Sequence, residues 1–399
     1  MRSLLKSLKS RSSGPLVTMK ATAPAVVSLE SMLETAAIEG ASDVHFEPKE
    51  SGLLVRFRTD GQMRDFTTIA LPQRDALLAR GKMMGGMDIT ERRLPQDGRA
   101  KLQVADRRFH LRMSTLPTVH GENLVVRLLD QSMPTQSFAG LGYSAAQSAA
   151  LKDALTGPAG LILLTGPTGS GKTTTLHAAL HALDYRGRVI HTLEDPVEYE
   201  FSAIRQTEIR EKIGLTFAAS LRALLRQNPD VMLVGETRDS ETAQLAVRGA
   251  LTGHLVLSTL HTNDALSAIP RLRDLGVESF LIAASLRLVA AQRLVRRLCA
   301  KCKVPHFALD TLRSRYHLPD AEFCQPVGCP ACQDRGFSGR IALHEVIPAR
   351  PFLPLIAHNA PDEELATLRR QENYPSLWSH GLDTAAAGHT TIEEVTRVL

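Results

Sequence analysis

Residues 166–173 match the phosphate-loop pattern G-x-x-x-x-G-K-[ST] in full, and this match constrains the fold more than any other feature of the chain. The motif follows the apolar run 161–164, which is typical of a buried strand, and precedes a stretch compatible with a helix. In such a loop, glycines let backbone N–H groups curl around phosphates, a lysine adds positive charge and a threonine hydroxyl ligates Mg²⁺. A glycine-rich turn without a ligand is the alternative, which the flanking patterns disfavour.

The motif therefore predicts a bound nucleoside triphosphate and Mg²⁺. The residues expected around the phosphates are Gly166, Pro167, Thr168, Gly169, Ser170, Gly171, Lys172, Thr173 and Thr174. Thr173 is the predicted magnesium ligand of the loop.

The length of 399 residues suits two or three domains. The longest apolar runs fall far short of the roughly 18–20 residues that a membrane span needs. The basic N-terminal segment also lacks the hydrophobic core of a secretory signal, so we expect a cytoplasmic protein. A net charge of +5 is modest for this length and does not by itself indicate nucleic-acid binding.

The N-terminal part of the chain is interpreted as a flexible leader, 1–27, followed by a small α+β domain, 28–130. Ser28 is the predicted N-cap of a helix that ends at Gly40. Further predicted elements are strands at 43–47 and 53–58, a turn at 60–61, a helix at 72–84, and strands at 108–113 and 123–129. A segment with Pro, Ser and Gly, 131–148, is the predicted linker.

The predicted core, 149–298, alternates between buried strands and helices. Its predicted strands are 161–165, 189–194, 231–234 and 255–259. These runs show little polar alternation, which is typical of a parallel sheet covered on both faces. We therefore predict an α/β fold with a RecA-like core, followed by a cysteine-rich module, 299–345, and a helical region, 346–399, whose last helix opens at Thr391.

Four of the five cysteines form two C-x-x-C pairs: Cys299 and Cys302, then Cys329 and Cys332. Structural disulfides are not expected in the cytoplasm, which keeps thiols reduced. Two such pairs can present four thiolates tetrahedrally to Zn²⁺ at about 2.3 Å. A site filled by four sulfurs has no open position for catalysis, so the predicted zinc stabilises the fold. Cys324 is expected to be a small buried apolar residue and not a ligand.

The apolar run 231–234 is followed by Gly235 and then by a carboxylate, Glu236. An acid at the C-terminal tip of a strand can hold Mg²⁺, directly or through its water shell, or can orient the attacking water. A strand that ends in Glu says little by itself. Its position after a phosphate loop in the same predicted domain favours the functional interpretation.

Several segments together resemble the type II secretion and type IV pilus assembly ATPases. The stretch 228–239 is similar to the acidic box of that family, 192–199 to its aspartate box and 252–263 to its histidine box. Segments 41–45 and 93–99 resemble its smaller domain. The resemblance runs from about residue 29 to the C-terminus. It implies an ATP-binding RecA-like core that follows a smaller, PAS-like α+β domain.

The resemblance also implies roles for individual residues. Glu198 is expected to align and deprotonate the attacking water, while Glu194 and Asp195 shape their loop or contact the water shell of the metal. Arg99 and Arg112 are expected to reach the phosphates, because a planar and permanently charged guanidinium suits the spread charge of the transition state. Whether each arginine acts within its own chain or on a neighbour is left open.

His254 and His261 flank the predicted strand 255–259, so we expect them near its opposite ends and not on one metal. The resemblance implies that they sense the γ-phosphate or a subunit boundary as hydrogen-bond donors. Without the resemblance, two structural histidines would be the ordinary interpretation.

As a whole, the resemblance implies a cytoplasmic, hexameric ATPase that powers assembly of a type IV pilus or a type II secretion pseudopilus by ATP-driven domain rotation. The implied partner is an inner-membrane platform protein, with peripheral association at the inner face of the inner membrane. Family members usually carry another N-terminal domain, and only about 27 residues precede the small domain here, so we expect the extra domain to be missing.

Two alternatives stay open. One is a nucleotide-gated scaffold without significant turnover, against which the intact acids and arginines argue. The other is a nucleic-acid motor for DNA uptake or conjugation on the same core. The sequence has no basic stripe interleaved with aromatic residues to support it, so no specific nucleic acid is expected as a partner.

Overall fold

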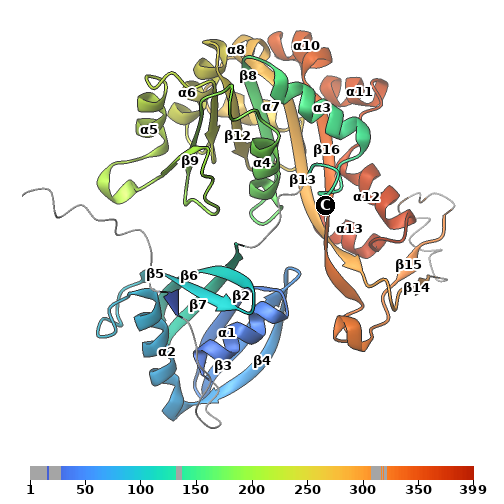
Figure 1. The fold of residues 1–399 in the computed structure, drawn as a ribbon. Helices are drawn as coiled ribbons and strands as arrows, with labels where there is room; N and C mark the ends of the chain where they lie inside the picture. The colour runs from blue at the N-terminus through green and yellow to red at the C-terminus, as the bar shows by residue number, and fades with distance from the viewer. Residues whose placement is uncertain (1–15, 18–27, 132–136, 307–315, 317, 319–320) are drawn as a thin grey trace, which may run out of the picture. The chain divides into compact units, whose positions relative to one another are not determined.

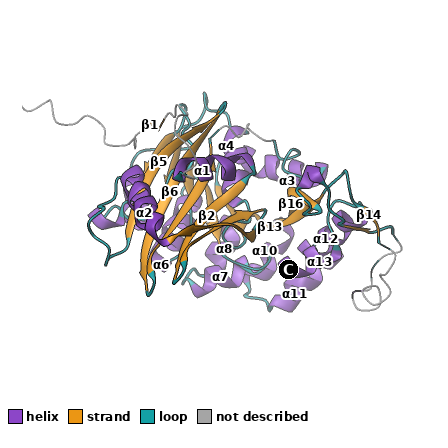
Figure 2. Cartoon of the chain, turned by 90° about the horizontal axis from the view of Figure 1, so that it is seen from below, coloured by secondary structure: helices purple, strands orange, loops and turns teal. Residues whose placement is uncertain are grey.

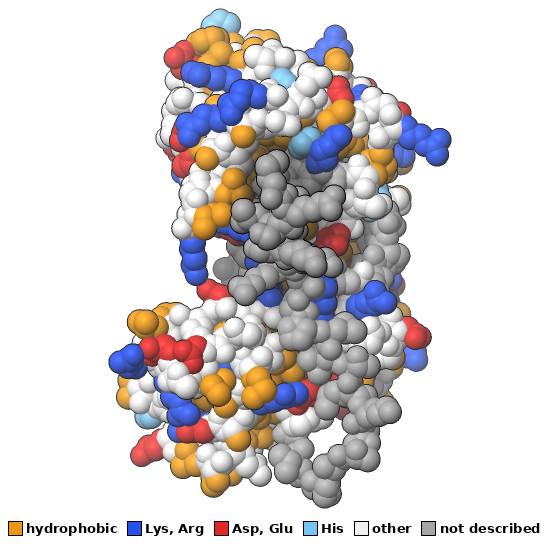
Figure 3. Space-filling view, turned by 60° about the vertical axis from the view of Figure 1, so that its left-hand side comes forward, with side chains coloured by type: hydrophobic (Ala, Val, Ile, Leu, Met, Phe, Trp, Pro, Cys, Tyr) orange, Lys and Arg blue, Asp and Glu red, His pale blue; other side chains and the backbone are white. Residues whose placement is uncertain are grey.

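The computed structural model describes residues 16–17, 28–131, 137–306, 316, 318 and 321–399. The chain divides into two compact units, Met1–Pro134 (unit 1) and Thr135–Leu399 (unit 2). Among the described residues, no helix is long and apolar enough to cross a bilayer. On the coloured part of the face in Figure 3, basic side chains lie among acidic and apolar ones.

The described part of unit 1 consists of a seven-stranded sheet in the order β1-β5-β6-β7-β2-β3-β4 and the helices α1 and α2 (Figure 1). Its strands are β1 Leu16–Val17, β2 Ala41–Lys49, β3 Gly52–Thr59, β4 Gln62–Ala70, β5 Gln96–Val104, β6 Arg107–Thr118 and β7 Gly121–Asp130, and its helices are α1 Leu29–Ile38 and α2 Leu71–Gly85. All strand pairs are antiparallel except β1–β5. Of the predicted leader, only β1 lies among the described residues.

One face of this sheet is apolar and packs against α1 and α2 (Figure 2). In β6, for example, Phe109, Leu111 and Met113 are buried in this core. Successive residues of a strand point to opposite faces, so Arg112 lies on the face away from the helices. The alternation thus gives unit 1 one packed face and one polar face.

Most local predictions for unit 1 are confirmed. Ser28 caps α1, since its hydroxyl accepts from the Ser31 N–H at 3.1 Å, and Gly40 follows the helix with a φ of 69°. Asp60 and Gly61 both have positive φ, which is typical of a two-residue hairpin turn. Strands β4 and β5 were not predicted, because most of their positions carry polar residues.

Unit 2 contains a second seven-stranded sheet in the order β10-β9-β11-β12-β8-β13-β16. The strands are β8 Gly160–Thr165, β9 Ile190–Glu194, β10 Arg205–Glu208, β11 Val231–Val234, β12 Leu255–Leu260, β13 Leu286–Leu298 and β16 Phe337–Pro348. The helices are α3 Ala145–Thr156, α4 Lys172–His181, α5 Phe217–Leu224, α6 Ser240–Leu251, α7 Ala268–Asp274, α8 Ser279–Ser285, α10 Leu353–Ala357, α11 Asp362–Gln371, α12 Leu377–Ala386 and α13 Ile392–Val398. Within this sheet, among the described residues, every strand pair is parallel except β13–β16.

Helices cover both faces of the unit 2 sheet (Figure 1). In β8, Leu161 and Leu163 pack into the core formed with α5 to α8, whereas Ile162 and Leu164 pack into the core formed with α3 and α4. The predicted parallel sheet and its four strands are confirmed. Thr391 caps α13, as expected, by accepting from the Glu394 N–H at 3.2 Å.

The structure adds two long strands to this sheet that the sequence did not predict, besides the short strand β10. β13 and β16 form a long antiparallel pair at one edge of the sheet, and the cysteine-bearing segment with β14 Val304–Pro305 and β15 Cys324–Gln325 lies between them in sequence. β16 begins within the predicted module 299–345, and α3 begins within the predicted linker 131–148. The domain boundaries themselves stay predictions.

Candidate nucleotide site

The P-loop joins β8 to α4 at the carboxyl edge of the unit 2 sheet, where ligands of parallel α/β sheets bind. Gly166 has a φ of 143° and Gly171 a φ of 89°, backbone conformations that favour glycine. A Cβ on Gly166 would lie 2.5 Å from the Gln292 carbonyl oxygen, and one on Gly171 would lie 2.5 Å from the side-chain nitrogen of Gln292. Both motif glycines are therefore required by the close approach of β13 as well as by conformation.

Lys172 is the first residue of α4, and its side chain folds back over the loop. Its ammonium donates to the carbonyl oxygens of Gly166 at 2.6 Å and Pro167 at 3.0 Å. Burial lowers the pKa of Lys172 to about 8; the Glu236 carboxylate acts in the opposite direction, and the Arg293 charge adds to the lowering. The ammonium thus lies within the loop and in the electrostatic field of Glu236.

Glu236 lies just beyond β11, at the same edge as the P-loop. β11 pairs with β12 and β12 with β8, all in parallel, so the residues that follow these strands meet at one edge. The Glu236 carboxylate is 2.7 Å from Arg238 Nη2 and 4.0 Å from His261 Nε2. Burial and then the Lys172 charge lower the pKa of His261, against the pull of Glu236. The charges of Lys172, Glu236 and His261 therefore interact with one another at this edge of the sheet.

The two predicted histidines lie at opposite ends of β12, as expected. His261 follows the strand at the P-loop edge. His254 precedes the strand at the other edge, where its Nδ1 is 2.9 Å from the Gly249 carbonyl oxygen and its own carbonyl accepts from the Gly160 N–H at 3.0 Å. Within one chain, the structure brings His261 to the P-loop edge and places His254 in the turn between α6 and β12.

The segment after β9 contains Glu198 and is held by Gln206 of β10. The Gln206 amide nitrogen donates to Glu194 Oε1 and to the Tyr199 carbonyl, both at 2.9 Å. Its amide oxygen accepts from the Phe201 N–H at 2.7 Å. Sequence reasoning missed Gln206, because nothing in the sequence shows that β10 lies beside β9.

Glu194 is buried at the end of β9. Burial by itself would raise the pKa of Glu194, but interactions with His177, Thr192 and Gln206 lower it. This geometry favours the first of the two roles predicted for Glu194, which is to shape the loop. Glu198 lies in the segment after β9, next to Tyr199, and its catalytic role stays a prediction.

β13 brings two polar residues to the P-loop that sequence reasoning missed. One is Gln292, which packs against the loop glycines. The other is Arg293, which is buried and donates to the carbonyls of Thr262 at 3.3 Å and Asn263 at 2.7 Å, so that it holds the turn that follows His261. The signal available in the sequence is a Gln-Arg pair with apolar residues on both sides.

In unit 1, Arg99 of β5, Arg112 of β6 and Arg127 of β7 lie directly opposite one another. Directly paired residues share a face of the sheet, and this face is the one away from α1 and α2. Asp43 of β2 continues the row and lies 2.9 Å from Arg127 Nε. The structure thus brings the two predicted arginines together and adds Arg127, which has no local sequence signal. Their contact with phosphate stays a prediction.

The four predicted zinc ligands gather in one cluster, with ligand atoms within 4.8 Å of one another. The Sγ atoms of Cys299 and Cys329 are 3.9 Å apart, and those of Cys302 and Cys332 are 3.8 Å apart. A tetrahedral site with Zn–S bonds of about 2.3 Å needs sulfurs about 3.8 Å apart. The donor set and its spacing therefore fit a zinc ion. Such a site has no free position, so its role would be structural.

The backbone around the cluster also favours a thiolate. The N–H groups of Cys329 and Gly336 donate to Cys332 Sγ at 3.3 and 3.2 Å. Burial by itself raises the pKa of a thiol, but at Cys332 these donors lower the pKa to about 7. Cys324 lies outside the cluster, as expected, although it is only partly buried.

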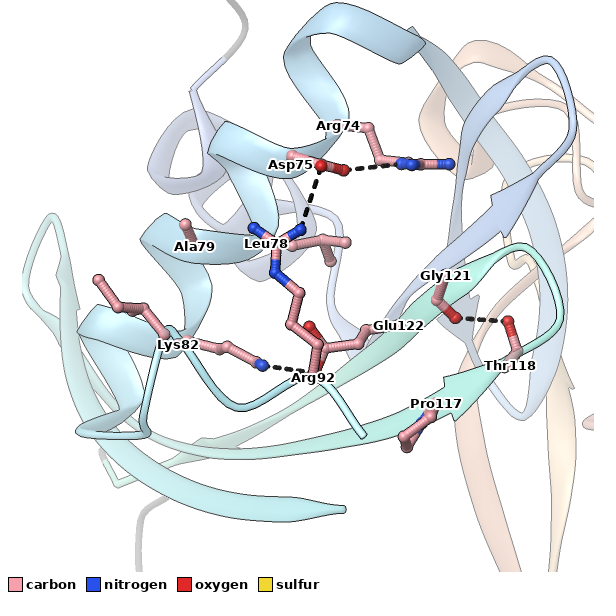
Figure 4. A pocket seen from close by; sticks show the side chains of 11 residues that line it. Arg74, Asp75, Leu78, Ala79, Lys82, Arg92, Pro117, Thr118, Gly121 and Glu122 are labelled. Carbon is pink, nitrogen blue, oxygen red and sulfur yellow. Dashed lines mark hydrogen bonds and ion pairs between the residues drawn. The ribbon is translucent and has the colours of Figure 1, made fainter. Parts of the chain in front are cut away.

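A separate pocket of ≈ 130 Å³ lies in unit 1, beside α2 and the β6–β7 hairpin (Figure 4). Lys82 and Glu122 form a buried ion pair in it. Arg74 and Arg92 both pair with Asp75, at 3.0 and 3.3 Å. Each of these charged groups has an oppositely charged partner within the pocket. The residues that line the pocket all belong to unit 1, whereas the P-loop belongs to unit 2, and we assign the pocket no chemistry.

Comparisons with known proteins agree with this geometry. A family profile described as "Type II/IV secretion system protein" matches residues 18–397. The type II secretion system ATPase E of Vibrio cholerae is 44% identical over 379 residues, which are 94% of this chain and 75% of the relative. The type IV pilus assembly ATPase PilB of Myxococcus xanthus is 45% identical over 381 residues, 94% of this chain and 67% of the relative.

Solved structures support the predicted fold. The Legionella pneumophila ATPase DotB matches with a TM-score of 0.71 at 19% identity, covering 96% of this chain and 98% of that one. The pilus retraction motor PilT with bound ADP matches with a TM-score of 0.60 at 24% identity, covering 93% and 96%. At these identities the likeness shows the fold alone, which is the predicted α/β fold with a RecA-like core. The sequence matches show the family, and the chain belongs to the type II/IV secretion system family of ATPases.

Proposed function

We propose that the chain is the motor that hydrolyses ATP to power assembly of a type IV pilus or a type II secretion pseudopilus. The observation that supports this most directly is the shared position of Lys172, Glu236 and His261 at the carboxyl edge of the sheet, beside the P-loop. Relatives named for each of the two systems are similar over 94% of the chain, so either system is compatible.

In this proposal the backbone N–H groups of residues 166–173 hold the phosphates. Lys172 exchanges the loop carbonyls for phosphate oxygens. Thr173 and Glu236 would hold Mg²⁺, which would supply positive charge beside the phosphates. Glu198 aligns and deprotonates the attacking water, while His261 responds to the γ-phosphate beside Glu236.

Arg99 and Arg112 supply positive charge to the phosphates from unit 1, in the same chain or a neighbouring one. Their direct cross-strand pairing supports this role, because it places two guanidinium groups next to each other on one face of the sheet, where both can approach one polyanion. His254, at the far end of β12, is the candidate for a contact at a subunit boundary.

The proposed assembly is a homo-hexamer in which ATP binding and hydrolysis rotate the smaller domain. It acts in the cytoplasm at the inner face of the inner membrane, bound to a platform protein. A zinc ion in the four-cysteine cluster stabilises unit 2 and takes no part in hydrolysis.

The test is a steady-state phosphate-release assay on the purified protein, with Lys172→Ala as the inactive control. Magnesium-dependent release that is lost in K172A is expected. ATP binding without release would leave only a nucleotide-gated scaffold. Strong, salt-sensitive stimulation by single-stranded DNA would instead point to a nucleic-acid motor. A pull-down that names the membrane partner would separate pilus from secretion systems.

A further inference from the structure

Gln292 of β13 joins that strand to the P-loop and to α4. It is 4% exposed. Its amide nitrogen donates to the Ser170 carbonyl at 2.7 Å, and its amide oxygen accepts from the Thr175 hydroxyl at 2.7 Å and the Tyr143 hydroxyl at 3.2 Å. The amide thus uses its donor on the loop and its acceptor on two hydroxyls, which fixes its orientation.

The bond to Ser170 determines the direction of a neighbouring donor. A trans peptide is planar, so its C=O and N–H point in opposite directions. Because the Ser170 carbonyl points to Gln292, the Gly171 N–H points away from β13. Gly166 and Gly171 have no side chains that would displace Gln292 from this position. In a P-loop, such backbone N–H groups are phosphate ligands.

We propose that Gln292 is a positioning residue for nucleotide binding, which holds the Ser170 carbonyl so that the Gly171 N–H faces the phosphates. This inference rests on the proposed ATP-binding function. The conformation of the P-loop then depends on a residue of β13, about 120 positions away in the sequence, and not on the motif alone.

The surroundings of Gln292 prevent water from replacing its bonds. Tyr143 is buried and stacks on His344 with ring centroids 3.5 Å apart, and His344 Nε2 is 3.0 Å from the Leu141 carbonyl oxygen. Burial raises the pKa of Tyr143 and lowers the pKa of His344 to about 3, so both stay neutral near pH 7. A lost Gln292 bond therefore leaves a polar group unsatisfied, which costs more than the bond itself.

The sharpest test is Gln292→Glu, measured by fluorescent-ATP titration at pH 8 and pH 6. An ionised Glu can still accept hydrogen bonds from the hydroxyls of Thr175 and Tyr143. Its second oxygen, however, would face the Ser170 carbonyl oxygen without a hydrogen between them and would be repelled by it. A protonated Glu can donate to Ser170 as the amide does, and burial raises the pKa of such a carboxyl toward this range. We expect ATP affinity in Q292E to be about 10- to 100-fold weaker than wild type at pH 8 and to recover to within about threefold at pH 6.

The charged groups around the loop are Lys172 on α4, Arg293 on β13, Glu236 after β11 and His261 after β12. They are the same in wild type and in Q292M, so the ratio of these two affinities removes their titration, whereas the carboxylate of Q292E adds a charge to this group and its ratio is compared with that of Q292M. The ionisation of ATP is removed in the same way.

Two further variants separate positioning from a structural effect. Gln292→Met keeps the shape without either bond, and we expect about tenfold weaker ATP binding with no pH dependence of the ratio. Tyr143→Phe loses one hydroxyl but keeps the stacking, and we expect affinity within about twofold of wild type. Melting temperatures of the nucleotide-free proteins report folding, so Q292M carries the test if Q292E does not fold.

The outcomes distinguish this inference from the proposed function. If wild type binds ATP and both Gln292 variants bind equally well, Gln292 is not a positioning residue and the proposed function stands. A Q292E deficit that is the same at both pH values would also overturn the inference, because a packing defect has no reason to be rescued by protonation. If wild type itself does not bind ATP, the proposed function falls and this inference with it.

Discussion

The P-loop and the cysteine cluster of unit 2 are built in different ways. The P-loop is a contiguous stretch whose backbone is shaped by Gly166 and Gly171 at the end of a parallel strand. The cysteine cluster is formed by side chains from two separate turns. These turns come together because Cys299 directly follows β13, and β16 begins shortly after Cys332, in an antiparallel pair.

The two regions also differ in what they can do. At the P-loop edge, Glu236 acts on the pKa of Lys172, and both groups act on the pKa of His261, beside backbone of the phosphate-binding pattern. In the cluster, four sulfurs at tetrahedral spacing would satisfy one ion completely. The comparison indicates that chemistry resides at the sheet edge and stability in the cluster. Each prediction that follows tests this division, in order of the expected effect on ATP chemistry.

Glu236→Gln should lower the rate of phosphate release by about 10²–10⁴-fold with little change in ATP affinity, because the amide keeps the shape but loses the charge that orients water or metal. Glu241→Gln is the matched control, since Glu241 forms an exposed ion pair with Arg222 on the surface of α5 and α6. Substantial residual turnover in E236Q would remove Glu236 from its assigned role.

ATP affinity should fall about tenfold between pH 7 and pH 9, measured by fluorescent-nucleotide titration. The pKa of Lys172 is lowered to about 8 in the nucleotide-free protein, so its ammonium is mostly protonated at pH 7 and mostly neutral at pH 9. Phosphate raises that pKa again, so binding takes up a proton and strengthens as the pH falls. Affinity that is flat across this range would contradict a direct Lys172–phosphate contact.

The two histidines at opposite ends of β12 test whether the chemistry is confined to the P-loop edge of the sheet. His261→Gln should slow turnover by roughly two- to tenfold, the range expected for one hydrogen bond beside Glu236. His254→Gln, at the opposite end of β12, should leave turnover of the isolated chain nearly unchanged. Equal losses in both variants would mean that His254 reaches the active site of another chain.

The cluster should show the reverse pattern. Cys329→Ser should remove bound zinc, measured as metal per chain, and lower the melting temperature by roughly 5–10 °C, because metal binding contributes to folding. ATP affinity should stay within about twofold of wild type. Cys324→Ser is the control, since that cysteine lies outside the cluster. Loss of ATP binding together with zinc would break the proposed separation of the two regions.

The sequence predicted the parts of the fold that local patterns specify. Buried strands such as Val231–Val234 and capped helices such as α1 were found because apolar runs and Ser28 are local signals. β13 and β16 were missed because their apolar runs contain arginines, which are accommodated at an edge by specific partners. One example is Arg296, which pairs with Glu394 at 2.5 Å.

The same limit applies to the candidate site. The P-loop, Glu236 and the cysteine pairs were recognised from contiguous residues or regular spacing. Gln292, Gln206 and Arg127 contact neighbours from other parts of the chain, which no local sequence pattern identifies. The resemblance to a family supplied Arg99 and Arg112, whereas their direct pairing required the strand register.

The most direct test is an experimental structure of the protein with Mg²⁺ and a non-hydrolysable ATP analogue. We predict that the β-phosphate lies within hydrogen-bond distance of the Gly171 N–H and the γ-phosphate within that distance of Lys172 Nζ, and that Thr173 and Glu236 are the residues nearest the metal. A nucleotide bound elsewhere, or a γ-phosphate at the P-loop edge out of reach of Lys172 and Glu236, would contradict the account.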